Sequence, residues 1–469
     1  MQWQQVLAVL RSPEYDANLL YVDPLRNPSC KRTRLRRSAW LVSLGSRTRT
    51  EQTAVVDPPM ASPTHADADR PASALAAYRR LPGSIWALGL VSMFMDMSSE
   101  LVHSLLPLFM VAVLGASMTT IGMLEGIAEA TAAVTKVFSG ALSDHFRKRK
   151  GLVVLGYALA AVTKPVFPLA STVGWIAGAR IVDRIGKGIR GAPRDAMIAD
   201  LEPRFRGAAY GLRQALDSVG AFLGPLLAVG FMLWFAGDIQ AVLWVAVVPA
   251  VLAVLLLIVG VQEPEITGQP QGPRPSLMTR AVTRLPRRYW LVVALGAVFT
   301  LARFSEAFLI LRARDVGLTA GYVPVIMIVM NLAYAACAYP AGAAADRVAG
   351  RMLLVAGLAM LVAADVVLAI ARTPAAAFAG AAFWGLHMAL TQGLLAKLVA
   401  DAAPHDLRGT AFGFFNLATG VALLLASLIA GSLWDAFGAE ATFAAGAGFA
   451  VLAAAGVLFY RPAARATQP

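Results

Sequence analysis

The stretch "RIVDRIGKGIRGAPRDAMIAD", residues 180–200, decides the fold because it allows two mutually exclusive interpretations. Its G-K-G-I-R-G core matches the G-x-G-x-x-G pattern of a dinucleotide-binding loop, which needs a strand before it and a helix after it within a βαβ unit. Here "STVGWIAGARIVD" precedes the glycines and shows no strand pattern, and the next apolar segment has the length of another membrane helix. We therefore exclude the nucleotide site and interpret the stretch as a charged membrane helix.

The composition of the whole chain favours a membrane protein. Of its 469 residues, 58% are hydrophobic and only 15% are charged, with a mean hydropathy of +0.63, whereas about 25% of the residues of a soluble domain are charged. A helix crosses a bilayer with about 20 mostly apolar residues. Twelve such segments are predicted, at residues 84–112, 117–142, 150–170, 173–200, 207–235, 239–262, 289–313, 320–345, 351–371, 374–401, 408–436 and 440–460.

The distribution of positive charge predicts the orientation. The net charge of +13 could indicate a nucleic-acid partner, but Lys and Arg gather in the loops on one side of the predicted helices, fourteen against three on the other. Cytoplasmic loops retain such charges, so we expect both termini in the cytoplasm, a bacterial inner (plasma) membrane location and no nucleic acid. The two cysteines, Cys30 and Cys337, are far apart, and no cofactor or metal site is expected.

Two similar halves flank a basic linker rich in Pro and Gly. "RGAAYG" at 206–211 has the counterpart "RGTAFG" at 408–413, and "GALSD" at 140–144 matches "GAAAD" at 342–346, both at an offset of 202 residues. Parallel half repeats are typical of one large class of transporters. We expect a basic disordered arm at 1–80, whose translation could begin at Met60, an N-terminal six-helix bundle at 81–263, a cytoplasmic linker at 264–288, a C-terminal six-helix bundle at 289–461 and a tail at 462–469.

As a helix, the opening stretch carries a stripe of charge. Arg180, Arg184 and Lys187 follow one another at steps of four and three, so they share one helix face. A charge at the bilayer centre costs at least a few kcal/mol, so this stripe must face water or opposite charges. Arg190 and Arg194 are nearer the cytoplasmic end, where they either extend the stripe or reach the membrane surface.

Charged residues on other predicted helices lie at similar depth. Buried ion pairs that hold the bundle together are one explanation, although such pairs barely offset their desolvation. Proton relays and substrate sites are the usual reason for charges at this depth. The candidate residues for proton coupling or substrate binding are Asp96, Glu100, His103, Glu125, Glu129, Arg180, Asp183, Arg184, Lys187, Arg213, Asp217, Arg303 and Glu306. Asp365 stands alone and could lie near a surface, and His387 is more typical of a hydrogen-bonded structural residue than of a metal ligand.

Residues 84–460 resemble the major facilitator superfamily. "GALSDHFRKRK" at 140–150 resembles that family's loop between its second and third helices, with Arg147 where the family has glycine, and "GAAADRVAGR" at 342–351 is a second copy. In the family, the acid and bases of this loop form a cytoplasmic charge latch that favours one gating state. The resemblance assigns this gating role to Gly140, Asp144, Lys148, Arg149, Asp346 and Arg347.

Two further motifs carry the resemblance. Arg184, Lys187 and Gly188 occupy the places of the family's fourth-helix motif, in which the Arg is associated with proton coupling, with Lys where Gln is more usual. "GAFLGPLLA" at 220–228 is similar to the fifth-helix signature of proton-driven antiporters, although its final glycines are absent. The matching residues are Gly220, Gly224 and Pro225.

The resemblance and the charges together imply an all-α polytopic membrane protein with twelve transmembrane helices in two pseudo-symmetric six-helix bundles. It is expected to be monomeric, not an enzyme, and surrounded by membrane lipid. It is expected to move a small solute by alternating access with protons, and the fifth-helix signature favours efflux by antiport. Proton-coupled uptake of an organic anion or metal chelate is the alternative, and a non-transporting sensor or lipid-handling protein is a second alternative.

The acids of the first half are the expected proton or substrate-cation sites, with Arg184, Lys187 and Arg213 as their partners or as anchors for an anionic substrate. A carboxylate that loses its basic partner during a rearrangement can take up a proton. The acids expected to do this are Asp96, Glu100, Glu129 and Asp217.

Overall fold

The computed structural model describes residues 80–146, 149–202, 205–263, 284–345, 348, 350–404 and 407–459. Every regular element within these ranges is helical. The predicted arm before residue 80, most of the linker at 264–288 and the tail at 462–469 lie outside the described residues.

The described helices are consistent with the twelve predicted segments. The first half comprises α3 (Gly83–Ala112), α4 (Met118–Phe146), α5 (Arg149–Thr163), α6 (Val166–Leu169), α7 (Val173–Leu201), α8 (Arg206–Trp234), α9 (Ile239–Val245) and α10 (Val247–Gly260). The second half comprises α12 (Arg287–Leu301), α13 (Ala307–Asp315), the 3-10 turn η1 (Ala320–Tyr322), α14 (Val325–Ala345), α15 (Gly350–Ile370), α16 (Pro374–Ala402), α17 (Arg408–Phe437) and α18 (Ala439–Phe459).

Some predicted segments consist of two shorter helices. α5 and α6 are separated at Lys164 and Pro165, because proline has no backbone N–H and its ring clashes with the carbonyl four residues earlier. α9 meets α10 at Ala246, and residues 302–306 separate α12 from α13. Within the described ranges, eight helical segments are long and apolar enough to cross a membrane. α4 and α7 are 29 residues long each but carry more charge.

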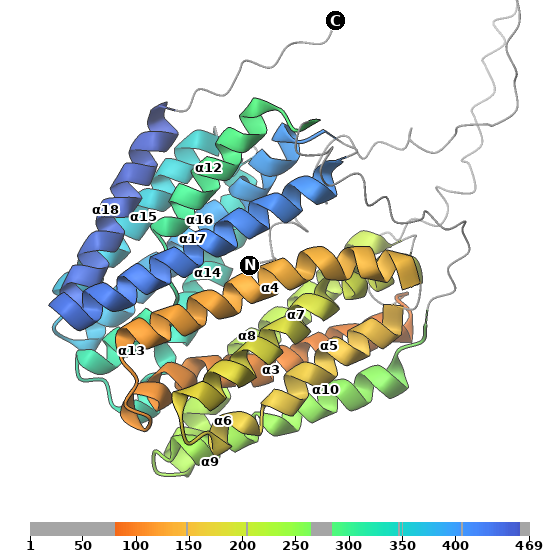
Figure 1. Ribbon diagram of the computed structural model, residues 1–469, viewed down its shortest axis with the longest axis horizontal. Helices are drawn as coiled ribbons and strands as arrows, with labels where there is room; N and C mark the ends of the chain where they lie inside the picture. Colours follow the sequence, from red (N-terminus) through yellow and green to blue (C-terminus); the bar gives the residue numbers. More distant parts are fainter. Residues whose placement is uncertain are drawn as a thin grey trace, which may run out of the picture. The chain divides into compact units, whose positions relative to one another are not determined.

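The two halves repeat the same helix pairings. In the first half α3 packs on α8 and α10, and α7 packs on α4 and α5; in the second half α12 packs on α17 and α18, and α16 packs on α14 and α15. Between the halves, α4 lies along α17 (Figure 1), α8 contacts α14 and α3 contacts α13. The sequence repeat is therefore also a repeat of packing, as expected for two related six-helix bundles.

The apolar core differs between the two ends of the helices. We call the end where α3 begins and α18 finishes the termini end, and the other the opposite end. One buried cluster combines residues of both halves, among them Phe109 of α3, Phe308 of α13 and Trp434 of α17. Two further clusters at the termini end belong to one half each, around Tyr157 and around Tyr289. The halves thus share buried apolar side chains mainly towards the opposite end.

The seam between α4 and α17 combines glycine contacts with a polar link. A Cβ at Gly126 of α4 would lie 2.6 Å from the Cα of Leu424 on α17, so the two backbones approach closely there. At the opposite end, the carboxylate of Asp435 on α17 accepts hydrogen bonds from the backbone N–H groups of Met118 at 2.9 Å and Thr119 at 2.8 Å. An acid of one half therefore caps a helix of the other half.

Candidate functional site

α7 runs unbroken through the G-K-G-I-R-G sequence, so the stretch forms no loop. Its glycines permit close helix approach. A Cβ at Gly188 would lie 2.5 Å from the Cβ of Thr135 on α4, and one at Gly186 would lie 2.6 Å from the carbonyl oxygen of Gly156 on α5. The helical interpretation is confirmed, and close packing on α4 and α5 carries the charged side chains of α7 into the first half.

Two ion pairs of α7 are fully buried. The guanidinium of Arg180 lies 2.5 Å from the carboxylate of Glu125 on α4. The ammonium of Lys164, in the turn between α5 and α6, lies 3.0 Å from the carboxylate of Asp183 and donates to the hydroxyl of Ser99 on α3 at 3.2 Å. All four charged side chains are at most 6% exposed. These pairs fix α7 against its neighbours, because removing one partner would leave an uncompensated buried charge.

A second group of charges is partly open to solvent. Arg184 lies 3.3 Å from the carboxylate of Glu129 on α4, whose side chain is 37% exposed. Lys187, one turn further along α7, is exposed. The carboxyl groups of Asp96 on α3 and Asp217 on α8 lie next to each other. Two ionised carboxylates at such close range repel each other, and a proton held between them would relieve this repulsion.

Asp195 of α7 connects this open group to α8. Its carboxylate lies 3.2 Å from Arg194 and 3.4 Å from Arg213, and Arg213 also pairs with Asp217 at 2.8 Å. The side chains of Arg194 and Arg190 are only 7% and 5% exposed. The alternative in which these two arginines reach the membrane surface is therefore wrong, and the charged stripe continues along α7.

Sequence reasoning missed Lys164 as a member of the site. It precedes a proline, which marks a helix end, and Lys at helix ends is usually solvated. The signal that could have found it is its place inside an apolar span of 21 residues, Arg149–Leu169. A lysine at that depth needs an acidic partner, and Asp183 of the adjacent helix supplies it.

The second half contributes fewer charges. Arg303 and Glu306 pair at 3.3 Å in the break between α12 and α13. The Nδ1 atom of buried His387 lies 2.8 Å from the carbonyl oxygen of Gly357, as a structural histidine would. Asp365 of α15 is fully buried, and among the described residues neither of its carboxyl oxygens has a hydrogen-bond partner. The expectation that Asp365 lies near a surface is therefore wrong.

The other predicted acids and the histidine of α3 lie near the same cations. Glu100 and Glu125 face Arg184, and His103 faces Glu125 and Glu129. Within the described ranges, no group of three or more His, Cys, Asp or Glu side chains is arranged to hold a metal ion.

The predicted gating loop can be placed only at its end. Arg149, at the start of α5, pairs with Asp200 of α7 at 2.5 Å, and its backbone N–H donates to the carboxylate of Glu263 at 2.7 Å. Lys148, Asp346 and Arg347 lie outside the described residues, as do the surroundings of Gly140 and Asp144 on α4.

The antiporter-like residues of α8 have a packing role. A Cβ at Gly224 would lie 2.7 Å from the Cβ of Glu100 and 2.8 Å from the carbonyl oxygen of Met97, both on α3, and Gly220 meets the α3 backbone in the same way. Pro225 is buried in the same helix. Small residues that let two membrane helices approach closely explain this part of the motif.

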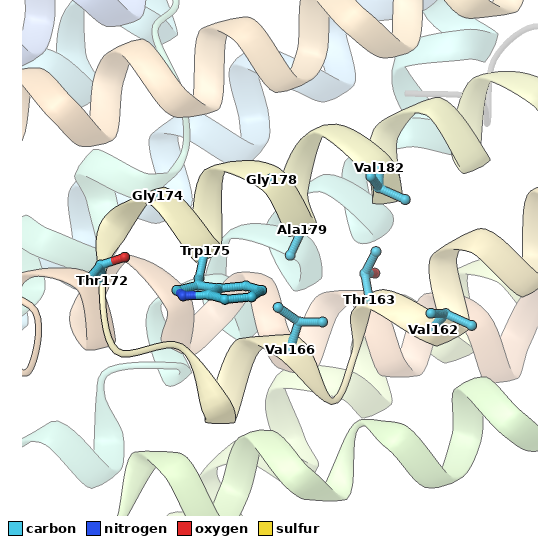
Figure 2. Close-up of a pocket in the computed structure, with 9 residues that line it drawn as sticks. All are labelled: Val162, Thr163, Val166, Thr172, Gly174, Trp175, Gly178, Ala179 and Val182. Carbon is cyan, nitrogen blue, oxygen red and sulfur yellow. The ribbon is translucent and has the colours of Figure 1, made fainter.

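A groove of about 540 Å³ lies beside the α5–α6 turn and the first half of α7 (Figure 2). Val162, Val166 and Trp175 are among the residues that line it, and none of the predicted charged residues does. The ring of Trp175 is exposed, and the lining is almost entirely apolar. The groove is therefore separate from the charged site.

Long apolar helices in two matching halves, with ion pairs buried inside, define a polytopic membrane transporter. The chain belongs to the major facilitator superfamily, whose family model matches residues 88–330 and 297–469. It is a transporter and not an enzyme.

The relatives agree with this assignment. The chain is 32% identical over 390 residues to the uncharacterized MFS-type transporter MJ1317 of Methanocaldococcus jannaschii, covering 81% of this chain and 96% of that one. It is 23% identical over 393 residues to the inner membrane transport protein YajR of Escherichia coli, covering 79% and 82%. Neither name states a substrate.

Solved structures show the same fold. A variant of the nucleoside transporter NupG superposes with a TM-score of 0.69 at 12% identity, covering 80% of this chain and 98% of that one. A bacterial homologue of the human lysosomal transporter Spinster, in an inward-facing conformation, superposes with a TM-score of 0.64 at 15% identity, covering 80% and 95%. At these identities the likeness concerns the fold alone.

Proposed function

We propose that the protein is a proton-coupled secondary transporter of a small solute, in which Asp96 and Asp217 carry the proton. The observation that supports this most directly is the close approach of the two carboxyl groups, because a shared proton would relieve the repulsion between two neighbouring carboxylates. The two residues are on α3 and α8, which pack along each other. A relative movement of these helices would separate the carboxyl groups and release the proton to water.

The cations around the pair link the proton to the rest of the site. They are Lys187, Arg190 and Arg194 of α7 and Arg213 of α8. When Asp96 and Asp217 share a proton, they present one negative charge to these cations; when the proton leaves, they present two. The proton therefore changes how strongly α7 is held against α3 and α8. This is a direct coupling between proton binding and helix position.

Alternating access is supported by how the halves pack. They share an apolar core mainly towards the opposite end and have separate clusters at the termini end. The buried pairs Arg180–Glu125 and Lys164–Asp183 hold α4, α5 and α7 together. We propose that the halves rock about the α4–α17 seam, with the termini on the cytoplasmic side of a bacterial plasma membrane as the loop charges predict.

The direction of transport is a separate question. Export by antiport stays a prediction from the fifth-helix resemblance, because close packing on α3 accounts for its glycines. A specific observation favours an anionic solute or chelate, the substrate class of the second candidate: among the described residues, Lys136, Lys187 and Arg190 make no ion pair. A sensor without transport would not need a shared proton among partly open charges.

The test measures whether the two acids make the conformation depend on pH. Spin labels at Val113 and Ile370, both exposed at the opposite end and in different halves, report the separation of the halves in lipid nanodiscs, with both native cysteines replaced. We expect the distance distribution of the otherwise wild-type protein to change between acidic and alkaline pH. Asp96→Asn and Asp217→Asn should each remove this change.

Asp365→Asn is the matched control, because it neutralises a buried acid outside the site. It should respond to pH as the wild type does. A pH response that persists in both Asp96→Asn and Asp217→Asn would overturn the proposal.

A further inference from the structure

Three cations of the first half make no ion pair with the acids that the structure describes. Lys136 of α4 and Lys187 and Arg190 of α7 make no ion pair within the part of the chain that the structure describes, whereas the neighbouring charges of α7 and α8 do. Arg190 is 5% exposed, and its Nη1 has no hydrogen-bond partner among the described residues. A buried guanidinium with an unused donor is costly, and an anionic ligand would satisfy it.

The fold places the three cations around the same part of α7. The methylenes of Lys136 lie 3.8–4.0 Å from the position that a Cβ of Gly191 would take, so its side chain lies over α7 one turn from Lys187, and Lys187 and Arg190 both lie near Asp96. The guanidinium of Arg190 stands 4.7 Å from the ring centroid of Tyr157 on α5, a cation–π contact that fixes its plane. Lys187 is exposed and Lys136 is half-buried, so a solute can reach them.

The acids nearby are already engaged. Asp96 lies next to Asp217, which pairs with Arg213. Glu129 pairs with Arg184, Asp195 pairs with Arg194 and Arg213, and Glu100 lies towards Arg184. A cationic solute would therefore have to displace an existing partner. An anionic solute would instead find free donors.

We propose that Lys136, Lys187 and Arg190 bind the anionic group of the transported solute, a carboxylate or a phosphate. Arginine offers a planar pair of donors to such a group, and lysine offers a mobile point charge. This inference rests on the proposed function, because it places the solute beside the proton pair. Protonation of Asp96 and Asp217 removes negative charge next to Lys187 and Arg190. Proton and anion should therefore favour each other's binding, as in symport.

The first test measures anion binding to purified protein. Inorganic phosphate, succinate and citrate are the probes, each against chloride at equal ionic strength, and tetraphenylphosphonium is the cationic probe. At least one anion should raise the thermal denaturation temperature more at acidic than at alkaline pH. Lys136→Gln and Lys187→Gln should each weaken its binding at least about tenfold, because each removes one charge from the anion's surroundings. Lys397→Gln, an exposed lysine of α16, should bind as the wild type does.

The second test needs no ligand. Removing a cation that belongs to a structural ion pair lowers the stability of the protein. Removing one of three unpaired cations instead relieves repulsion among them. In the absence of anions, Lys187→Gln and Lys136→Gln should therefore denature at the wild-type temperature or above it, unlike Arg180→Gln. Loss of stability in both lysine variants would show structural roles and would overturn the proposal. Failure of all three anions to stabilise the wild type would overturn it too.

Failure here is distinguishable from failure of the proposed function. If the spin-label distances respond to pH through Asp96 but no anion binds, the proposed proton coupling is supported and the proposed anion site is refuted. If an anion binds and its affinity is independent of pH in both the wild type and Asp96→Asn, the proposed anion site is supported and the proposed proton coupling is refuted. Stabilisation by tetraphenylphosphonium alone would replace the anion with a cationic substrate.

Discussion

If the halves alternate as proposed, replacing Asp435 should shift the balance between the two conformations. Its carboxylate belongs to the last turn of α17, where the partial negative charge of the helix end disfavours an acid. Hydrogen bonds from Met118 and Thr119 at the start of α4 compensate for this only while the halves are together at the opposite end. Asp435→Ala removes both bonds, so the joined arrangement loses stability relative to the separated one.

The size of this shift follows from the geometry. Removing an N-cap costs about 0.5–2 kcal/mol, and Asp435 is exposed, which places its contribution near about 1 kcal/mol. Because about 1.4 kcal/mol is a tenfold change in an equilibrium constant, the ratio of joined to separated molecules should fall about fivefold. The spin labels at Val113 and Ile370 would show this as a larger long-distance population.

Asp238→Ala is the control for this prediction. The carboxylate of Asp238 accepts a hydrogen bond from the backbone N–H of Ala241 at 3.1 Å and so caps α9 within the first half. Its loss should lower stability by a similar amount and leave the distance distribution unchanged. The reasoning is refuted if Asp435→Ala leaves the distribution as in the wild type, or if Asp238→Ala shifts it equally.

Two further predictions concern the packing of α7. Arg180→Met or Glu125→Gln should lower the free energy of unfolding by about 3–5 kcal/mol, because each leaves its buried partner without an ion pair. The combined Arg180→Met, Glu125→Leu variant should recover most of this loss. Equal stability of the single and combined variants would argue against the pair. Gly188→Leu should lower the free energy of unfolding by about 1–3 kcal/mol or more, because its Cβ would lie 2.5 Å from the Cβ of Thr135. Gly178→Leu should be tolerated, since nothing lies within 4 Å of the Cβ position there. Thermal denaturation in detergent measures both, and equal losses at the two glycines would contradict the packing.

The helices and their division into two related halves could be predicted from the sequence, because membrane spans follow from apolar length. The offset of 202 residues between matching motifs indicated two related halves, and the packing repeats accordingly. The charged face of α7 followed from its spacing, since residues three and four apart share a helix face. The breaks at residues 164–165 and 302–306 were not expected, because they depend on packing as well as on proline.

Which charges meet could not be predicted, because partners come from helices whose rotation the sequence does not reveal. Spacing could not separate the buried pair of Arg180 and Glu125 from the open pair of Arg184 and Glu129, although the two pairs lie one turn apart on both helices. The burial of Arg190 depends on the Tyr157 ring of another helix. The isolation of Asp365 likewise depends on its neighbours.

The most direct test of the account is an infrared measurement of the proton shared by Asp96 and Asp217. Asp365→Asn serves as the background, because it removes another buried carboxyl group. In this background, we predict the carbonyl stretching band of a protonated carboxyl group, which should disappear at alkaline pH. The band should be absent when Asp96→Asn or Asp217→Asn is added to the background. A band that titrates unchanged in both of these variants would contradict the account, since the proton would then be held elsewhere.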